Sequence, residues 1–231
     1  MRTPLFHSSA RPALTALAAV GMLVGCQKPA VTEAPVVAAL TVVQGNDQSV
    51  QAGKELPHPV VLRVTDRSGV KMAGIPVTLV VAAGGGTVSP ASGVTDAQGE
   101  YSAKWTVGPV ADNQLLASIS GLDPVRITAL GIVPSDIIIA QGNSQTAIKG
   151  GALLTSIVVR VVGGGNVPMV GITVLFQVLS GGGAISPQSA VTSSLGEVTV
   201  KWTLGTVVGT QTAVVTASTL SPATLTATAL P

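Results

Sequence analysis

Apolar and polar residues alternate along much of this chain with the two-residue period of β-strands. In the clearest run, residues 100–107, one face is apolar and the other polar: Tyr101, Ala103, Trp105 and Val107 against Ser102, Lys104 and Thr106. Successive side chains of a strand point to opposite faces, so this run predicts one packed face and one solvated face. Residues 197–204 repeat the alternation around Trp202. Both tryptophans are therefore expected in a core.

Further strands are expected where β-branched residues gather between turn residues. These strands are residues 60–65, 76–81, 114–120, 125–129, 157–162, 172–178, 213–217 and 223–229. No stretch beyond residue 26 has a convincing helical period. About seven short strands in each half of the chain, separated by turn signals, predict an all-β fold of two-sheet sandwiches.

The two halves of the chain repeat one another. Gln44-Gly45-Asn46 returns as Gln141-Gly142-Asn143, an offset of 97 residues, and Lys104-Trp105-Thr106 returns as Lys201-Trp202-Thr203. This offset is expected to hold as far as Gln114 and Gln211 and to slip by one residue before Pro124 and Pro222. Such a register indicates tandem copies of one domain. We expect them at residues 39–131 and 136–231, joined by a short link at residues 131–135.

The first 25 residues are typical of a secretory signal peptide. Residues 1–11 are basic without an acidic residue, and residues 13–23 form an apolar run. That run is about half of the roughly 20 residues that a membrane-spanning helix needs. Leu23, Val24 and Gly25 directly before Cys26 resemble the lipobox of bacterial lipoproteins.

In lipoproteins the signal is cut before the cysteine, whose thiol and amino group are then acylated. The resemblance implies that Cys26 is the first mature residue and the membrane anchor. Gln27 after the cysteine, by the enterobacterial sorting rule, implies delivery to the outer membrane, on its periplasmic or surface face. Residues 26–38 are then expected to be a flexible tether. An ordinary secretory signal with a chance cysteine is the alternative.

Charge and cysteine content exclude several kinds of partner. Cleavage would remove Arg2 and Arg11 and leave ten basic residues against ten acidic ones, so the mature chain would carry no net charge. No basic patch then points to nucleic acid. A single cysteine excludes an internal disulfide framework and a zinc site built from several thiolates.

Several motifs recur in order through both copies. In the first they are residues 45–46, 61–66, 74–79, 84–90, 95–99 and 105–108. With these motifs both copies resemble bacterial Ig-like domains of group 1 (Big-1), found in the intimin and invasin adhesins. The resemblance implies two immunoglobulin-like β-sandwiches in tandem. The second copy departs from the family pattern in two turns, residues 163–166 and 193–196, which affects loop conformation and not the fold.

Glycines and carboxylates offer two candidate binding sites. The triple glycines at residues 84–86 and 181–183 lack the following Lys and Ser/Thr of a phosphate loop and are expected to be tight turns. A calcium site would use Asp66, Asp96 and Glu100, but the second copy has Gly163, Ser193 and Glu197 at those positions. Asp66 and Asp96 are therefore expected to form turns. Asp123 and Asp136 are expected to flank the junction, where two carboxylates are too few for calcium. We expect no metal and no cofactor.

Catalysis finds few candidate residues. His58 is the one histidine left after cleavage, it stands between two prolines, and the second copy has Thr155 there. If Trp105 and Trp202 were exposed, their rings could stack on sugars, but the residues at every second position around them are apolar, which favours the core. The resemblance implies a non-catalytic lipoprotein of the bacterial envelope that acts in adhesion or protein interaction. The alternatives are an architectural spacer or assembly partner, and a glycan-binding module.

Overall fold

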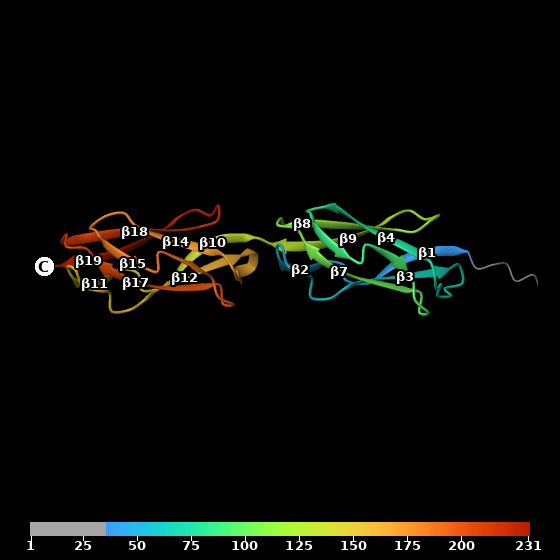
Figure 1. Cartoon of the computed structure of the whole chain (residues 1–231), viewed down its shortest axis with the longest axis horizontal. Coiled ribbons are helices and arrows are strands. Elements are labelled where there is room, and N and C mark those ends of the chain that lie inside the picture. Colours follow the sequence, from blue (N-terminus) through green and yellow to red (C-terminus); the bar gives the residue numbers. More distant parts are fainter. Residues whose placement is uncertain (1–35) are drawn as a thin grey trace, which may run out of the picture. The chain divides into compact units, whose positions relative to one another are not determined.

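The computed structural model describes residues 36–231. The predicted signal peptide, the predicted lipobox Leu23–Gly25 and the predicted anchor Cys26 lie outside the described residues. The described chain consists of strands and one short 3-10 turn, η1 (Gly164–Asn166), so the predicted all-β class is confirmed (Figure 1). No helix among residues 36–231 has the length and apolar character needed to cross a membrane.

The first sandwich consists of two sheets. One sheet has the order β1-β3-β7-β5, with β1 (Val37–Gln44), β3 (Val60–Asp66), β7 (Glu100–Val107) and β5 (Gly86–Ser89). The other has the order β2-β9-β8-β4-β6, with β2 (Gln48–Gln51), β9 (Val125–Ile132), β8 (Asp112–Ser118), β4 (Pro76–Ala83) and β6 (Ser92–Val94). Neighbouring strands are antiparallel except β2, which runs parallel to β9.

The second sandwich repeats this topology. One sheet has the order β10-β12-β17-β15, with β10 (Pro134–Gln141), β12 (Ile157–Gly163), β17 (Glu197–Leu204) and β15 (Gly183–Ser186), and β13 (Val167–Pro168) pairs with β12. The other has the order β11-β19-β18-β14-β16, with β11 (Gln145–Ile148), β19 (Ala223–Leu230), β18 (Gly209–Ala217), β14 (Thr173–Val178) and β16 (Ser189–Val191). Strand β11 is again parallel to β19.

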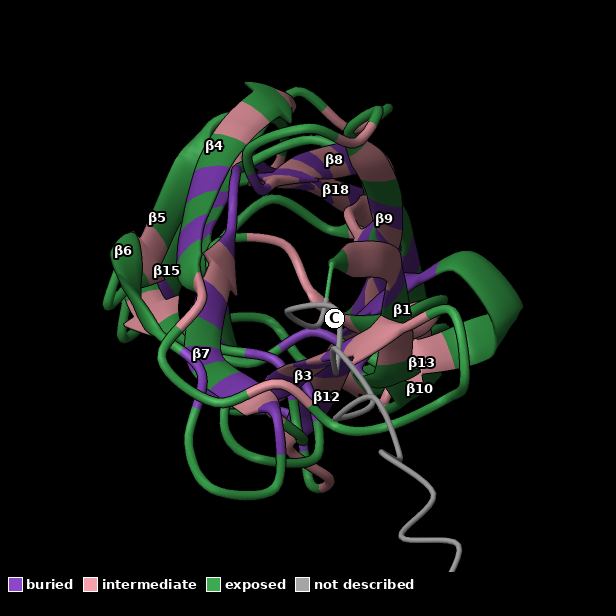
Figure 2. Cartoon of the chain, turned by 90° about the vertical axis from the view of Figure 1, so that its right-hand side faces the viewer, coloured by how far each residue is buried: buried purple, intermediate pink, exposed green. Residues whose placement is uncertain are grey.

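Each sandwich closes over its own core. Burial alternates along the strands, which Figure 2 shows as bands on β4 and β7. Trp105 and Trp202 are both 0% exposed, and aliphatic side chains from both sheets surround each of them. Burial of about 25 cal/mol per Å² of apolar surface drives this closure. The period-two pattern therefore identified the core face of β7 and β17.

Several strands differ from the expected ones. β1 begins at Val37, so the expected tether of residues 26–38 ends too late: Val37 already pairs with Asp66 of β3. β9 ends at Ile132 and β10 begins at Pro134, so strand residues make up nearly all of the expected link at residues 131–135. The eight-residue strands β1 and β10 were not expected, nor were the short strands β2, β5 and β6, their counterparts and β13. The short strands have two to four residues, too few for a clear periodic pattern.

The repeat also slips earlier than the sequence register suggested. In the first sandwich the inward positions of β8 include Asn113, Leu115 and Ala117, and in the second those of β18 include Gln211 and Ala213. Asn113 therefore corresponds to Gln211, an offset of 98 residues, and the match of Gln114 with Gln211 is wrong. The extra residue lies in the loop before β18, because that loop is where the backbone can absorb it without reversing the strand's faces.

Candidate functional site

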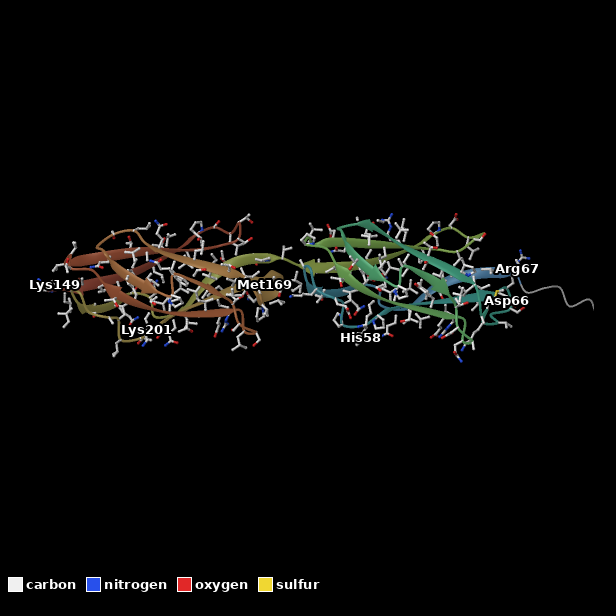
Figure 3. The ribbon with its side chains drawn as sticks, viewed as in Figure 1. His58, Asp66, Arg67, Lys149, Met169 and Lys201 are labelled. Carbon is white, nitrogen blue, oxygen red and sulfur yellow. The ribbon has the colours of Figure 1, made fainter. Side chains whose placement is uncertain are left out.

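The carboxylates that could bind calcium are bound to backbone and to arginine instead. Asp66 Oδ1 accepts the backbone N–H groups of Ser68 (2.8 Å) and Val70 (2.9 Å) in the turn after β3 (Figure 3). Asp96 Oδ1 accepts those of Gln98 and Glu100, both at 2.8 Å, in the turn before β7. These bonds close turns in the manner expected of Asp.

In the second copy a serine closes the turn before β17. Ser193 Oγ accepts the backbone N–H groups of Leu195 (3.2 Å) and Glu197 (3.3 Å). These distances are longer than those at Asp96, and the acceptor carries no charge. The turn is therefore built in the same way with weaker bonds.

Glu100 and its counterpart Glu197 each pair with an arginine of the adjacent strand. Arg63 Nε donates to Glu100 Oε1 at 3.1 Å, and Arg160 Nε donates to Glu197 Oε1 at 3.1 Å, with a second, shorter contact from Nη2 in each pair. The side chains are a quarter to less than half exposed. Each pair ties β7 to β3, or β17 to β12, across the outer face of its sheet.

The two acidic residues expected at the junction lie far apart. Asp123 precedes β9, while Asp136 belongs to β10, so the whole of β9 separates them. At about 3.3 Å per residue, its eight residues span roughly 26 Å. The expectation that Asp123 and Asp136 flank one junction is therefore wrong. Among residues 36–231 there is no cluster of three or more His, Cys, Asp or Glu side chains able to hold a metal.

The triple glycines form tight backbone at the strand ends. Gly84, Gly85 and Gly86 all have positive φ, between +81° and +88°. A Cβ on Gly86 would lie 2.2 Å from the carbonyl oxygen of Thr106, and one on Gly84 would lie 2.4 Å from Asn113 Oδ1. The glycines of the second copy have the same φ sign and the same crowding. They allow β5 and β15 to approach β7 and β17 closely.

A buried amide beside each triple glycine was not found from the sequence. Asn113 Oδ1 accepts the Gly108 N–H (2.7 Å), and its Nδ2 donates to the carbonyl of Val110 (2.9 Å). Gln211 Oε1 accepts the Gly205 N–H (2.8 Å), and its Nε2 donates to the carbonyl of Val207 (2.8 Å). The sequence offered one signal for each amide: a single polar residue at an inward-facing position of an otherwise apolar strand face.

His58 lies in a loop that is fixed through its backbone. Gln48 clamps it: the His58 N–H donates to Gln48 Oε1 (2.9 Å), and Gln48 Nε2 donates to the His58 carbonyl (2.8 Å). Gln145 holds Thr155 in the same way. The imidazole itself is exposed at the edge of the first sandwich (Figure 3). The clamp accounts for the loop without any role for the ring.

Among residues 36–231, Tyr101 is the one aromatic residue whose polar side-chain atom has a hydrogen-bond partner. Its hydroxyl donates to the Pro90 carbonyl at 2.6 Å, and its ring lies over Gly93, where a Cβ would be 2.7 Å from the ring. Burial raises the pKa of the Tyr101 hydroxyl. By contrast, the indole Nε1 atoms of Trp105 and Trp202 are buried without a hydrogen-bond partner. Neither indole is placed to stack on a sugar.

Comparisons with known proteins give structural neighbours alone. No known family and no curated protein matches the chain. The D0-D1 domain of intimin is similar at 17% identity over 83% of this chain and 95% of that one, with a TM-score of 0.36. Domains 4 and 5 of the S-layer protein SbsC are 15% identical over 84% and 99%, with a TM-score of 0.46. The Yersinia pseudotuberculosis adhesin InvE is 18% identical over 83% and 59%, with a TM-score of 0.42.

Proposed function

We propose that this protein is a lipid-anchored, non-catalytic interaction module of the bacterial envelope that acts in adhesion through its two sandwiches. One observation carries the proposal. The polar side chains at the candidate calcium positions have structural roles: Asp66, Asp96 and Ser193 close turns, and Glu100 and Glu197 pair with arginines. What each sandwich offers to a ligand is its outer sheet faces and its loops.

The anchor is proposed from the sequence. Leu23-Val24-Gly25-Cys26 resembles a lipobox, and the acyl chains on Cys26 would hold the chain at a membrane. Each buried methylene contributes about 0.8 kcal/mol, so two or more chains give a stable anchor. We place the protein at the outer membrane on the strength of Gln27.

The anchor is tested by fractionation of cells that express the full chain. Cys26→Ser should move the protein from the membrane fraction to the soluble fraction, while Gln27→Ser, which keeps the thiol, should leave it with the membranes. A Cys26→Ser protein that stays membrane-bound would show that the anchor assignment is wrong. Shaving of intact cells with protease then tells the surface face from the periplasmic face.

Adhesion is tested by retention of the chain from Cys26 onward on living cells. Saturable capture by host or neighbouring cells would support the proposal. Capture by isolated envelope components alone would replace it with the architectural role. Release by simple sugars would replace it with glycan binding. The control is an unrelated β-sandwich protein at the same concentration, which should not be retained.

A further inference from the structure

The outer face of one sheet of the second sandwich is rich in threonine and free of charge. We call the outward side chains of β11, β19, β18, β14 and β16 the threonine face. Eight of them are threonines: Thr146, Thr173, Thr210, Thr212, Thr216, Thr224, Thr226 and Thr228. The others are Ile148, Leu175, Gln177, Ser189, Val191, Val214 and Leu230. The alternate residues of β18 and β19, which point inward, are buried.

The threonines stand in register across the strands. Thr210 lies opposite Thr228, and Thr212 lies opposite Thr226, in the β18–β19 pair. Thr146 of β11 continues the first of these rows on the other side of β19. Neighbouring strands are about 4.8 Å apart, so the rows form a continuous lattice of methyl and hydroxyl groups. Threonine is stiff at χ1, and this lattice therefore loses little side-chain entropy when it is covered.

All five charged residues after Val133 lie off this face. Asp136, Arg160, Glu197 and Lys201 belong to the opposite sheet, and Lys149 follows β11 in an end loop. Figure 3 shows Lys201 on β17, on the side of the sandwich away from β18 and β19. The corresponding face of the first sandwich carries Asp112 on β8 and Arg126 on β9. The absence of charge therefore belongs to one face of one copy and not to the fold.

These properties select a particular kind of partner. A hydroxyl is both donor and acceptor, so a threonine can bond to the same threonine of another molecule, which two lysines or two glutamates cannot do. The sheet is twisted, as sheets of L-amino acids are, so a partner with a flat surface would not fit against it. A second twisted sheet of the same hand packs on it at about −30°. The same face of a second copy meets both requirements.

We propose that the threonine face pairs with the threonine face of a second copy of this chain, through a two-fold contact of sheet on sheet. This inference rests on the proposed adhesive function and names its partner as the protein itself. A two-fold contact brings the same patch of both molecules together and closes without forming a fibre.

The size of the face sets the strength of the pairing. Its five strands hold 4, 8, 9, 6 and 3 residues. At about 3.3 Å per residue and about 4.8 Å between strands, they cover roughly 475 Å² per copy, or about 950 Å² for the pair. Stable complexes bury about 1,600 Å² in total, so the pairing is weak in solution. Many copies held at one surface by an anchor would multiply it by avidity. A pairing of this kind is suited to contact between surfaces.

The test uses beads that carry the chain from Cys26 onward, coupled through its single thiol, and measures clustering of the beads. Beads with the unchanged chain should cluster. The double variant Thr210→Lys and Thr224→Lys should reduce clustering about tenfold or more, because like charges meet across the two-fold contact. Both threonines are exposed, and neither takes part in a side-chain hydrogen bond among the described residues. The matched control, Thr199→Lys with Ala184→Lys on the opposite sheet, adds the same charge and should cluster normally.

Mixed beads make the test specific for self-pairing. Thr210→Glu with Thr224→Glu should reduce clustering to the same extent, and a mixture of the lysine and glutamate beads should regain it. Clustering that the lysine pair leaves intact, or that the mixture fails to regain, would overturn self-pairing. Beads that bind cells without clustering would overturn it too and leave the adhesive function standing. Beads that do neither would count against both proposals.

Discussion

We expect the buried side-chain amide of Gln211 to stabilise the second sandwich. Its side chain is 0% exposed and bonds to Gly205 and Val207. In Gln211→Leu the Gly205 N–H loses its one acceptor, whereas the Gly205 carbonyl keeps the N–H of Gly150 at 3.0 Å. One orphaned buried donor costs about 1–3 kcal/mol, and the lost bond to the Val207 carbonyl about 1 kcal/mol more. We expect the free energy of unfolding to fall by about 2–4 kcal/mol.

The assay is urea unfolding followed by tryptophan fluorescence. In a Trp105→Phe background Trp202 is the one tryptophan, so its emission reports the second sandwich. With a slope of about 1–3 kcal/mol per molar urea, the midpoint should fall by about 0.7–4 M. The control Gln177→Leu changes an exposed glutamine of the neighbouring strand and should shift stability by less than about 0.5 kcal/mol.

A further variant tests why one copy has glutamine and the other asparagine. The loop from Gly205 to Gln211 is one residue longer than the loop from Gly108 to Asn113. Gln211→Asn alone should destabilise, because the shorter side chain no longer reaches the loop. Deletion of one loop residue together with Gln211→Asn should recover part of the loss. If Gln211→Leu shifts the midpoint by less than about 0.5 M at an unchanged slope, the amide does not hold the loop and the reasoning fails.

Three further predictions concern the turns and the tyrosine, all measured by urea unfolding. Tyr101→Phe should lower the free energy of unfolding by about 1 kcal/mol. Because the pKa of Tyr101 is raised, the stability that its hydroxyl contributes should be complete below about pH 10 and be lost as the pH rises through the pKa of the folded state. The variant should lack this loss. Gly183→Ala should lower the free energy of unfolding by more than about 2 kcal/mol, because its Cβ would lie 2.3 Å from a carbonyl oxygen of β17. Gly150→Ala, with open space around the new Cβ, should lower it by about 1 kcal/mol. Equal losses in the two variants would contradict the role of crowding at Gly183. Ser193→Asp should stabilise the second sandwich by about 0.5–1 kcal/mol by restoring the stronger acceptor found at Asp96, and a loss of stability would contradict this.

The sequence predicted those features that depend on local period and on turn chemistry. Trp105 and Trp202 were placed in cores because their neighbours at every second position are apolar. Asp66 and Asp96 were expected in turns because their side chains bond to the backbone two to four residues on, a local event. The sandwich followed from the number of such strands and the spacing of their turns.

Features that depend on closure in three dimensions were missed. Asn113 and Gln211 looked like ordinary polar residues, because only the folded loop brings the Gly108 or Gly205 N–H onto them. The register slip was placed too late for the same reason: matching letters favoured Gln114 with Gln211, while the inward face of the strand requires Asn113. The separation of Asp123 from Asp136 is different, because the strand expected at residues 125–129 already lies between Asp123 and the link and could have revealed it.

The two copies provide an internal comparison that separates what the fold needs from what it leaves free. The buried threonines are the same: Thr95 and Thr192 each donate to a methionine carbonyl at 2.6 Å and accept an isoleucine N–H at 2.9 Å. The glutamine clamps and the arginine–glutamate pairs are likewise the same. The outer faces differ, with Asp112 and Arg126 in one copy and uncharged side chains in the other. Since the fold tolerates charge on this face, its absence from the second copy is not a structural requirement, and binding that distinguishes the copies should be sought there.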